Sequence, residues 1–238
     1  MNELLSGELQ KVWACISEAL VAEKLSHHTP GNRTKIGEGP DFLVMNGEQK
    51  VWIEVVCPEP KGIPAEWLDI QFGSVESVPH REILLRWTSA IKVKAEKQIG
   101  SIDRTKKGYL TSGLTDLSDA YVIAVNGCRL RNGPFPGVLG ISQFPYAAEA
   151  VFPIGPFGYQ IDKKSLQAVG SGHQYRPFVL NKNDSPVTSE SFLDSKYAPI
   201  SAIWAVDLNG GLTLGNHEPM VVIHNPLAIN PIPVCFLP

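Results

Sequence analysis

The sequence lacks the features that define several common classes of protein. Its 238 residues carry a net charge of −3, so the chain has no overall basic charge of the kind that marks many nucleic-acid-binding domains. No apolar run approaches the roughly 18 residues of a membrane span. The first residues also lack the basic segment and long apolar stretch of a signal peptide. We therefore expect a cytoplasmic protein with no membrane partner.

Cysteine is scarce, and the familiar catalytic motifs are missing. The four cysteines have no CxxC spacing, which favours reduced core thiols over a zinc site or a disulfide framework; they are Cys15, Cys57, Cys128 and Cys235. No GxSxG, Walker, HExxH or strand-terminal GxGxxG motif is found, which disfavours the hydrolase, NTPase, zinc protease and dinucleotide-binding classes that depend on them. With 43% hydrophobic and 19% charged residues, the composition is that of an ordinary globular protein.

The stretch from Gly37 to Pro58 predicts two strands joined by a tight turn. Residues 42–45 form a short apolar run, and residues 51–56 are rich in β-branched and aromatic side chains. Between them, Asn46-Gly47 is a strong signal for a two-residue hairpin turn. The prolines that follow residue 57 end the second strand, because proline cannot donate to a ladder.

Two carboxylates are offered by this predicted hairpin. Glu54 stands in the middle of the apolar strand VWIEVVC. A lone buried carboxylate is costly, so this group must be protonated, paired or bound to a cation. Asp41 begins the first strand directly after Pro40, whose ring stiffens the backbone entering the strand.

Pro40-Asp41, a turn, and Glu54 in an apolar strand 13 residues after Asp41 resemble the core of the restriction-endonuclease-like, PD-(D/E)xK, nuclease superfamily. The resemblance implies that Asp41 and Glu54 bind Mg²⁺ or Mn²⁺, with the Val55 backbone carbonyl as a third ligand. It also implies a mixed central sheet flanked by helices. The chain departs from the pattern at Val56, where the family has a catalytic lysine. Some members supply this lysine from the following helix instead.

The following helix is expected over Arg81–Ile102. At about 100° per residue, its apolar stripe consists of Leu84, Trp87, Ile91, Ala95, Gln98 and Ile102. Lys92 and Lys94 flank this stripe on opposite edges, whereas Lys97 points away. A lysine at the edge of a buried face can extend to a site beside the sheet, so Lys94 is the first candidate for the catalytic lysine and Lys92 the second. Surface charge is the alternative for both.

Two further residues are candidates for the site. An amphipathic helix is expected over Glu3–Leu25, and the family resemblance implies that Glu18, or Glu8, adds a carboxylate to the metal site. A solvated helix charge is the alternative. Gln98, one turn beyond Lys94, is a candidate for orienting water or a phosphate, with core packing as the alternative.

The densest basic region is a candidate for contacts with nucleic-acid phosphates. It contains Lys97, Arg104, Lys106 and Lys107, together with Lys92 and Lys94. An ordinary solvated face is the alternative for this region.

The remainder of the chain divides into a strand, an irregular insertion and a terminal hairpin. Tyr121–Val125 predicts a central strand parallel to its partner. It completes an α/β nuclease-like core over residues 1–128. Residues 129–199 predict loops and short hairpins over the core, and residues 200–238 a hairpin of Ile200–Val206 with Met220–His224, followed by an extended tail. All three segments are expected to form one domain.

These features lead to two hypotheses. The first is a Mg²⁺-dependent nuclease that hydrolyses phosphodiester bonds, with DNA favoured over RNA and a homodimer as one form of the active enzyme. The second is a nuclease-like binding or interaction module without activity, because Val56 stands at the usual lysine position and the chain is acidic overall.

Overall fold

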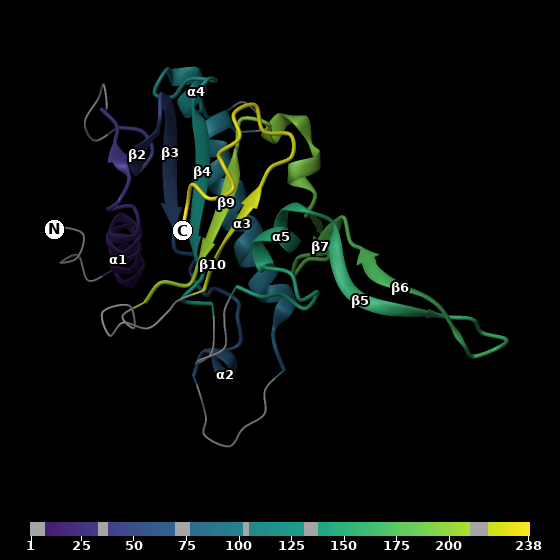
Figure 1. The fold of residues 1–238 in the computed structure, drawn as a ribbon. Helices are drawn as coiled ribbons and strands as arrows, with labels where there is room; N and C mark the ends of the chain where they lie inside the picture. Colours follow the sequence, from purple (N-terminus) through teal and green to yellow (C-terminus); the bar gives the residue numbers. More distant parts are fainter. Residues whose placement is uncertain (1–7, 33–37, 70–76, 102–104, 131–137, 210–218) are drawn as a thin grey trace.

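A six-stranded mixed sheet lies at the centre of the protein (Figure 1). The computed structural model describes residues 8–32, 38–69, 77–101, 105–130, 138–209 and 219–238. The strand order is β1-β2-β3-β4-β9-β10. The strands are β1 (Thr29–Pro30), β2 (Phe42–Asn46), β3 (Gln49–Val56), β4 (Ala120–Asn126), β9 (Ala202–Val206) and β10 (Met220–His224). The mixed α/β class expected from the sequence is therefore confirmed.

Strands β2 and β3 form the predicted antiparallel hairpin, with a turn one residue later than expected. Asn46 pairs with Gln49, so the two turn residues are Gly47 and Glu48 and not Asn46-Gly47. Gly47 has a φ of 60°, a conformation that glycine adopts without steric cost at the first position of a type II′ turn.

The segment from β3 to β4 is a crossover through the long helix α3 (His80–Ile99). β4 is parallel to β3, as the sequence predicted, and every residue of β4 is buried. The helix ends at Ile99 and not at residue 102, because Gly100 has a φ of 88° and leaves the helical conformation. Residue 102 lies outside the described residues. Two short helices flank α3 in the chain, α2 (Ala65–Leu68) and α4 (Tyr109–Ser112).

Helices cover both faces of the sheet. Successive side chains of a strand point to opposite faces. Val51, Ile53 and Val55 of β3 pack in one cluster with residues of α1 (Leu9–Lys24) and its C-terminal end. Trp52, between them, packs in a second cluster with α3. Glu54 shares the face of Trp52, so its carboxylate is directed to the α3 side. The predicted start of α1 at Glu3 lies outside the described residues.

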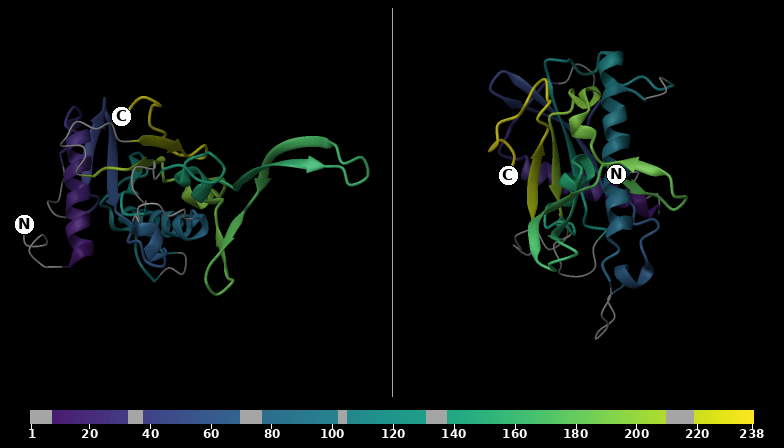
Figure 2. Two further views of the ribbon diagram at one scale, coloured as in Figure 1. Left: turned by 90° about the horizontal axis from the view of Figure 1, so that it is seen from below. Right: turned by 90° about the vertical axis from the view of Figure 1, so that its right-hand side faces the viewer.

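The segment 129–199 contains a helix that the sequence analysis did not predict. This helix, α5 (Tyr146–Val151), is fully buried and packs on α3. The hairpin of β5 (Ile154–Ile161) and β6 (Ala168–Tyr175) extends away from the sheet instead of lying over the core, as Figures 1 and 2 show. A second hairpin and two 3-10 turns follow: β7 (Phe178–Leu180), β8 (Pro186–Thr188), Ser191–Leu193 and Ser195–Tyr197.

The C-terminal hairpin belongs to the same sheet as the N-terminal strands. β9 and β10 pair antiparallel, as predicted, and β9 also lies parallel to β4. No helix among the described residues is long and apolar enough to cross a membrane. The cysteines are free, but they are not all core thiols: Cys57 is buried, whereas Cys235 is exposed.

The sheet interior gives a first prediction. Ile123 of β4 is fully buried between the helices, so Ile123→Ala should lower the free energy of unfolding by about 2–5 kcal/mol. The exposed Val234 provides the matched control, since Val234→Ala should change it by less than about 0.5 kcal/mol. Urea denaturation followed by tryptophan fluorescence measures both values. Equal effects of the two substitutions would contradict the assignment of β4 to the core.

Candidate active site

Asp41 and Glu54 lie next to each other beside the start of β2. The antiparallel register pairs Phe42 with Ile53, so Asp41, the residue before β2, stands beside Glu54 on β3. The Asp41 carboxylate accepts a hydrogen bond from the backbone N–H of Val55, at 2.6 Å. Because β2 begins only at Phe42, the aspartate side chain occupies the edge position that a strand partner would otherwise take. The hairpin thus brings the two predicted metal ligands together.

Glu54 is buried, and both of its carboxylate oxygens contact side chains from outside the β2–β3 hairpin. Only 1% of its side chain is exposed, and its Oε1 accepts hydrogen bonds from Lys94 Nζ at 2.6 Å and Lys97 Nζ at 2.7 Å. The Tyr109 hydroxyl lies 3.5 Å from the other oxygen, Oε2. An ion pair with two ammonium groups offsets the desolvation that a buried carboxylate would otherwise suffer.

The helix positions decide which lysines reach this site. Lys94 and Lys97 are three residues apart and therefore lie on the same side of α3. The prediction that Lys97 points away was wrong, because its long side chain extends back to Glu54 even though 46% of it is exposed. Lys92, the second candidate for the catalytic lysine, is not brought to the site. Its side chain is 53% exposed and lies 3.9 Å from Glu96.

Burial and neighbouring charges shift the pKa values of three side chains at the site. Burial and the negative charge of Glu54 raise the pKa of Asp41, and the same two causes raise the pKa of Tyr109. Burial alone would lower the pKa of Lys97, but its hydrogen bond and attraction to Glu54 outweigh that effect and raise it. Lys97 is therefore a cation at neutral pH.

The donor set suits a hard divalent cation. Asp41 and Glu54 offer carboxylate oxygens, and a strand residue directs its N–H and C=O to the same side. The Val55 carbonyl therefore faces the edge where its N–H meets Asp41. Mg²⁺ binds through one or two carboxylates and retains several waters. In the described part of the chain, no group of three or more His, Cys, Asp or Glu side chains could hold a metal ion. Any ion at this site would therefore be completed by the carbonyl, water or substrate oxygens.

The other predicted site residues lie away from Glu54. Glu18 comes from α1, on the opposite face of the sheet. Gln98 is buried and accepts a hydrogen bond from Thr115 at 3.0 Å, which is a packing role. Lys106 and Lys107 are exposed in the turn before α4, and Arg104 lies outside the described residues.

A second buried carboxylate, Glu149, was not predicted from the sequence. Glu149 of α5 is fully buried and accepts a hydrogen bond from the Ser142 backbone N–H at 2.8 Å and another from its hydroxyl. Its Oε2 lies 2.6 Å from His80 Nε2 and 2.8 Å from an Arg176 guanidinium nitrogen. The available signal was an ionisable residue inside the apolar run YAAEAVF, the same signal that singled out Glu54. Tyr109 carried no comparable signal.

Comparison of the chain with protein-family models, with curated proteins and with solved structures finds no match. The site is therefore interpreted from its own geometry.

Glu149 should make the fold sensitive to acid. Burial by itself would raise the pKa of Glu149, but the hydrogen bonds from His80, Ser142 and Arg176 outweigh it and lower the pKa from 4.5 to about 2. A carboxyl with a lowered pKa stabilises the folded state above its unfolded pKa, and this stabilisation is lost as the pH falls from about 5 to about 2. The shift corresponds to about 3 kcal/mol.

Denaturation at a series of pH values tests this prediction. Glu149→Gln should lower stability at neutral pH by about 3 kcal/mol and flatten the acid dependence. The matched control is the exposed Glu23, which lies 3.6 Å from Lys24; Glu23→Gln should change stability by less than about 1 kcal/mol. An unchanged acid dependence in Glu149→Gln would show that other carboxylates control acid unfolding.

Proposed function

We propose that this protein is a Mg²⁺-dependent nuclease with a restriction-endonuclease-like core, which hydrolyses phosphodiester bonds in nucleic acid. DNA is the favoured substrate. Asp41 and Glu54 act as metal ligands together with the Val55 carbonyl, and Lys94 is the catalytic lysine. Lys97 joins Lys94 as a second cation.

The observation that carries the proposal is the contact between Lys94 and Glu54 at 2.6 Å. In the family that the hairpin resembles, the lysine two residues after the glutamate has the catalytic role, and this chain has Val56 there. Lys94 brings an ammonium group to the same carboxylate from the following helix. This agrees with the displaced lysine that the resemblance implies.

The order of elements gives further support. The chain passes through the long helix α1, strands β1 to β3, the long helix α3 and then β4, which is parallel to β3; the short helices α2 and α4 precede and follow α3. The same succession is expected of the nuclease core. The carboxylates lie on the hairpin and the lysines on the crossover helix, so each part of the proposed site comes from a rigid element.

The proposed roles follow from the contacts. Bound Mg²⁺ would supply positive charge to the scissile phosphate and lower the pKa of a water molecule. Asp41, fixed by the Val55 N–H, orients one ligand oxygen towards the edge of the sheet. Lys94, of which 14% is exposed, would donate to a phosphate oxygen and so stabilise the charge that develops in the transition state.

One observation favours a second candidate, an inactive nuclease-like binding module. Two carboxylates, Asp41 and Glu54, face two ammonium groups, Lys94 and Lys97, so the formal charges of the site cancel. A balanced set of charges also serves to fix α3 on the sheet without any metal. Activity and metal binding separate the two candidates.

The nuclease proposal predicts a defined pattern of activity loss. With Mg²⁺ or Mn²⁺ and single- or double-stranded DNA and RNA, the wild type should cleave at least one substrate. Asp41→Asn, Glu54→Gln and Lys94→Met should each lower the rate by about 100-fold or more. Lys97→Met should have a smaller effect, since Lys97 is the more exposed of the two lysines. Circular dichroism spectra and melting curves establish that each variant is folded.

The control is Lys163→Gln, in the exposed turn between β5 and β6, which should cleave at the wild-type rate. Calorimetric titration with Mg²⁺ or Mn²⁺, with and without a non-cleaved oligonucleotide, measures the metal site directly. Binding that is lost in both Asp41→Asn and Glu54→Gln supports the nuclease. A wild type that neither binds metal nor cleaves any substrate would instead support the inactive module.

A further inference from the structure

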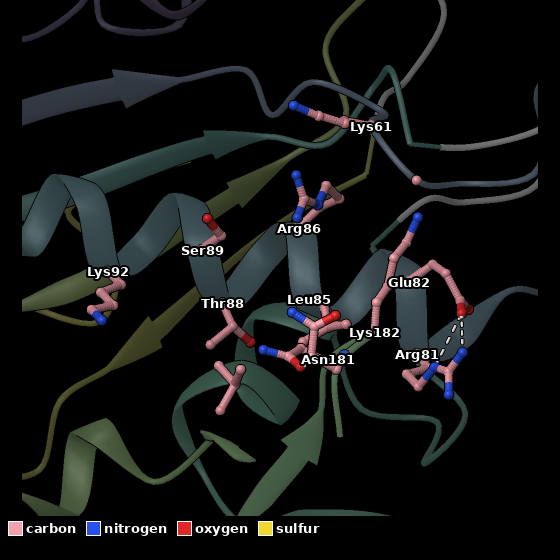
Figure 3. A pocket seen from close by; sticks show the side chains of 13 residues that line it. Lys61, Arg81, Glu82, Leu85, Arg86, Thr88, Ser89, Lys92, Asn181 and Lys182 are labelled. Carbon is pink, nitrogen blue, oxygen red and sulfur yellow. Dashed lines mark hydrogen bonds and ion pairs between the residues drawn. The ribbon is translucent and has the colours of Figure 1, made fainter. Parts of the chain in front are cut away.

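A basic groove lies along the outward side of α3 (Figure 3). It has a volume of about 460 Å³ and is formed by α3, the loop before α2 and the turn between β7 and β8. Among the described residues, its charged lining consists of Lys61, Arg81, Arg86, Lys92, Lys182 and a single acid, Glu82. With five cations and one anion, this described lining is net positive, whereas the whole chain has a net charge of −3.

Among the described residues, three of these five cations form no ion pair, whereas Lys92 lies 3.9 Å from Glu96. Arg81 forms an ion pair with Glu82 at 2.7 Å. Within the described residues, no carboxylate forms an ion pair with Lys61, Arg86 or Lys182. Lys182 also approaches the loop closely, since a Cβ placed on Gly62 would lie 3.3 Å from its Nζ. Like charges gathered in this way repel one another, and a polyanion would relieve that repulsion.

The groove is elongated. A second hollow of about 280 Å³ shares Thr88, Lys92 and Val187 with the first and adds Lys196 at its far side. Together they extend along α3 and the β7–β8 hairpin. A single small anion would occupy only part of such a channel, whereas a chain of phosphates would use its length.

Arg86 connects the groove to the proposed active site. Arg86 and Lys97 are 11 residues apart on α3, which is about three turns, so they lie on the same side of the helix and about 16 Å apart. A strand that places a phosphate at Lys97 and Glu54 and follows α3 therefore reaches Arg86 within a few nucleotides.

We infer that this groove binds the phosphate backbone of the nucleic-acid substrate a few nucleotides from the phosphate that is cleaved. The inference rests on the proposed nuclease function. Lys61, Arg86 and Lys182 are the principal phosphate contacts. Lys92 and Lys196 extend the track as weaker contacts, because Glu96 and Asp194 already pair with them. The described residues that line the groove include no exposed aromatic side chain, so binding there depends on phosphate charge and not on base stacking.

Fluorescence anisotropy with metal chelated by EDTA separates binding from cleavage. The probes are labelled single-stranded DNA, duplex DNA and single-stranded RNA of about 20 nucleotides, which is longer than the span from Lys97 to Arg86. The test variant is Lys61→Gln/Arg86→Gln/Lys182→Gln, with each single substitution alongside in case the triple variant does not fold. The control is Lys163→Gln/Lys164→Gln, which removes exposed lysines from the turn of the β5–β6 hairpin.

The triple variant should bind at least one probe about tenfold more weakly than the wild type, and the control should bind it equally well. The slope of log K against log salt should become shallower by about two for a single strand, because three phosphate contacts are lost. Equal affinity of the triple variant and the wild type overturns the inference, as does the absence of wild-type binding to all three probes. Polyglutamate is a further competitor to test. If it binds the wild type as tightly as the nucleic-acid probes do, and loses affinity equally in the triple variant, the inference is overturned and the groove binds an acidic protein segment.

Binding and cleavage measured together distinguish failure of the proposed nuclease function from failure of the groove inference. Groove-dependent binding with no cleavage by the wild type in Mg²⁺ or Mn²⁺ would keep the groove and overturn the nuclease. Cleavage by the wild type together with unchanged binding and cleavage by the triple variant would keep the nuclease and overturn the groove.

Discussion

The burial of the Glu54 carboxylate is the constraint on which the arrangement of this protein depends. A carboxylate with 1% of its side chain exposed, in the middle of a sheet, must find compensating charge. Lys94 and Lys97 provide it, and both come from α3. The ion pairs therefore fix the rotation of α3 about its axis as well as its position on β3.

α3 connects the polar parts of the molecule. Its first residue, His80, contacts the second buried carboxylate, Glu149, and its last turns carry the lysines that contact Glu54. Between them, the outward side of the helix forms one wall of the basic groove. A single rigid helix thus sets the spacing between the groove and the two carboxylates, and any change in its packing on β4 would alter all three.

The distribution of charge explains how an acidic chain can still offer a surface for a polyanion. The net charge of −3 describes the sum over 238 residues. Five of the basic side chains gather along the groove, and one acid accompanies them among the lining residues that the structure describes. Electrostatic attraction to a ligand depends on this local balance, because exposed charges more than about 10 Å apart are largely screened by salt. Overall charge alone is therefore a poor argument against nucleic-acid binding here.

The sequence by itself determined the features that depend on neighbouring residues. The β2–β3 hairpin, the parallel strand β4 and the buried stripe of α3 were all predicted, since strand and helix periodicity are local properties. Glu54 was recognised because an ionisable residue in an apolar strand requires a partner. Only the tertiary structure decided which partner this is. Lys97 contacts Glu54 from 43 residues away in the chain while Lys92 faces solvent, because the choice depends on how α3 is rotated and how far each lysine extends. The cluster around Glu149 and the outward direction of the β5–β6 hairpin likewise depend on contacts between distant segments, which no local pattern contains.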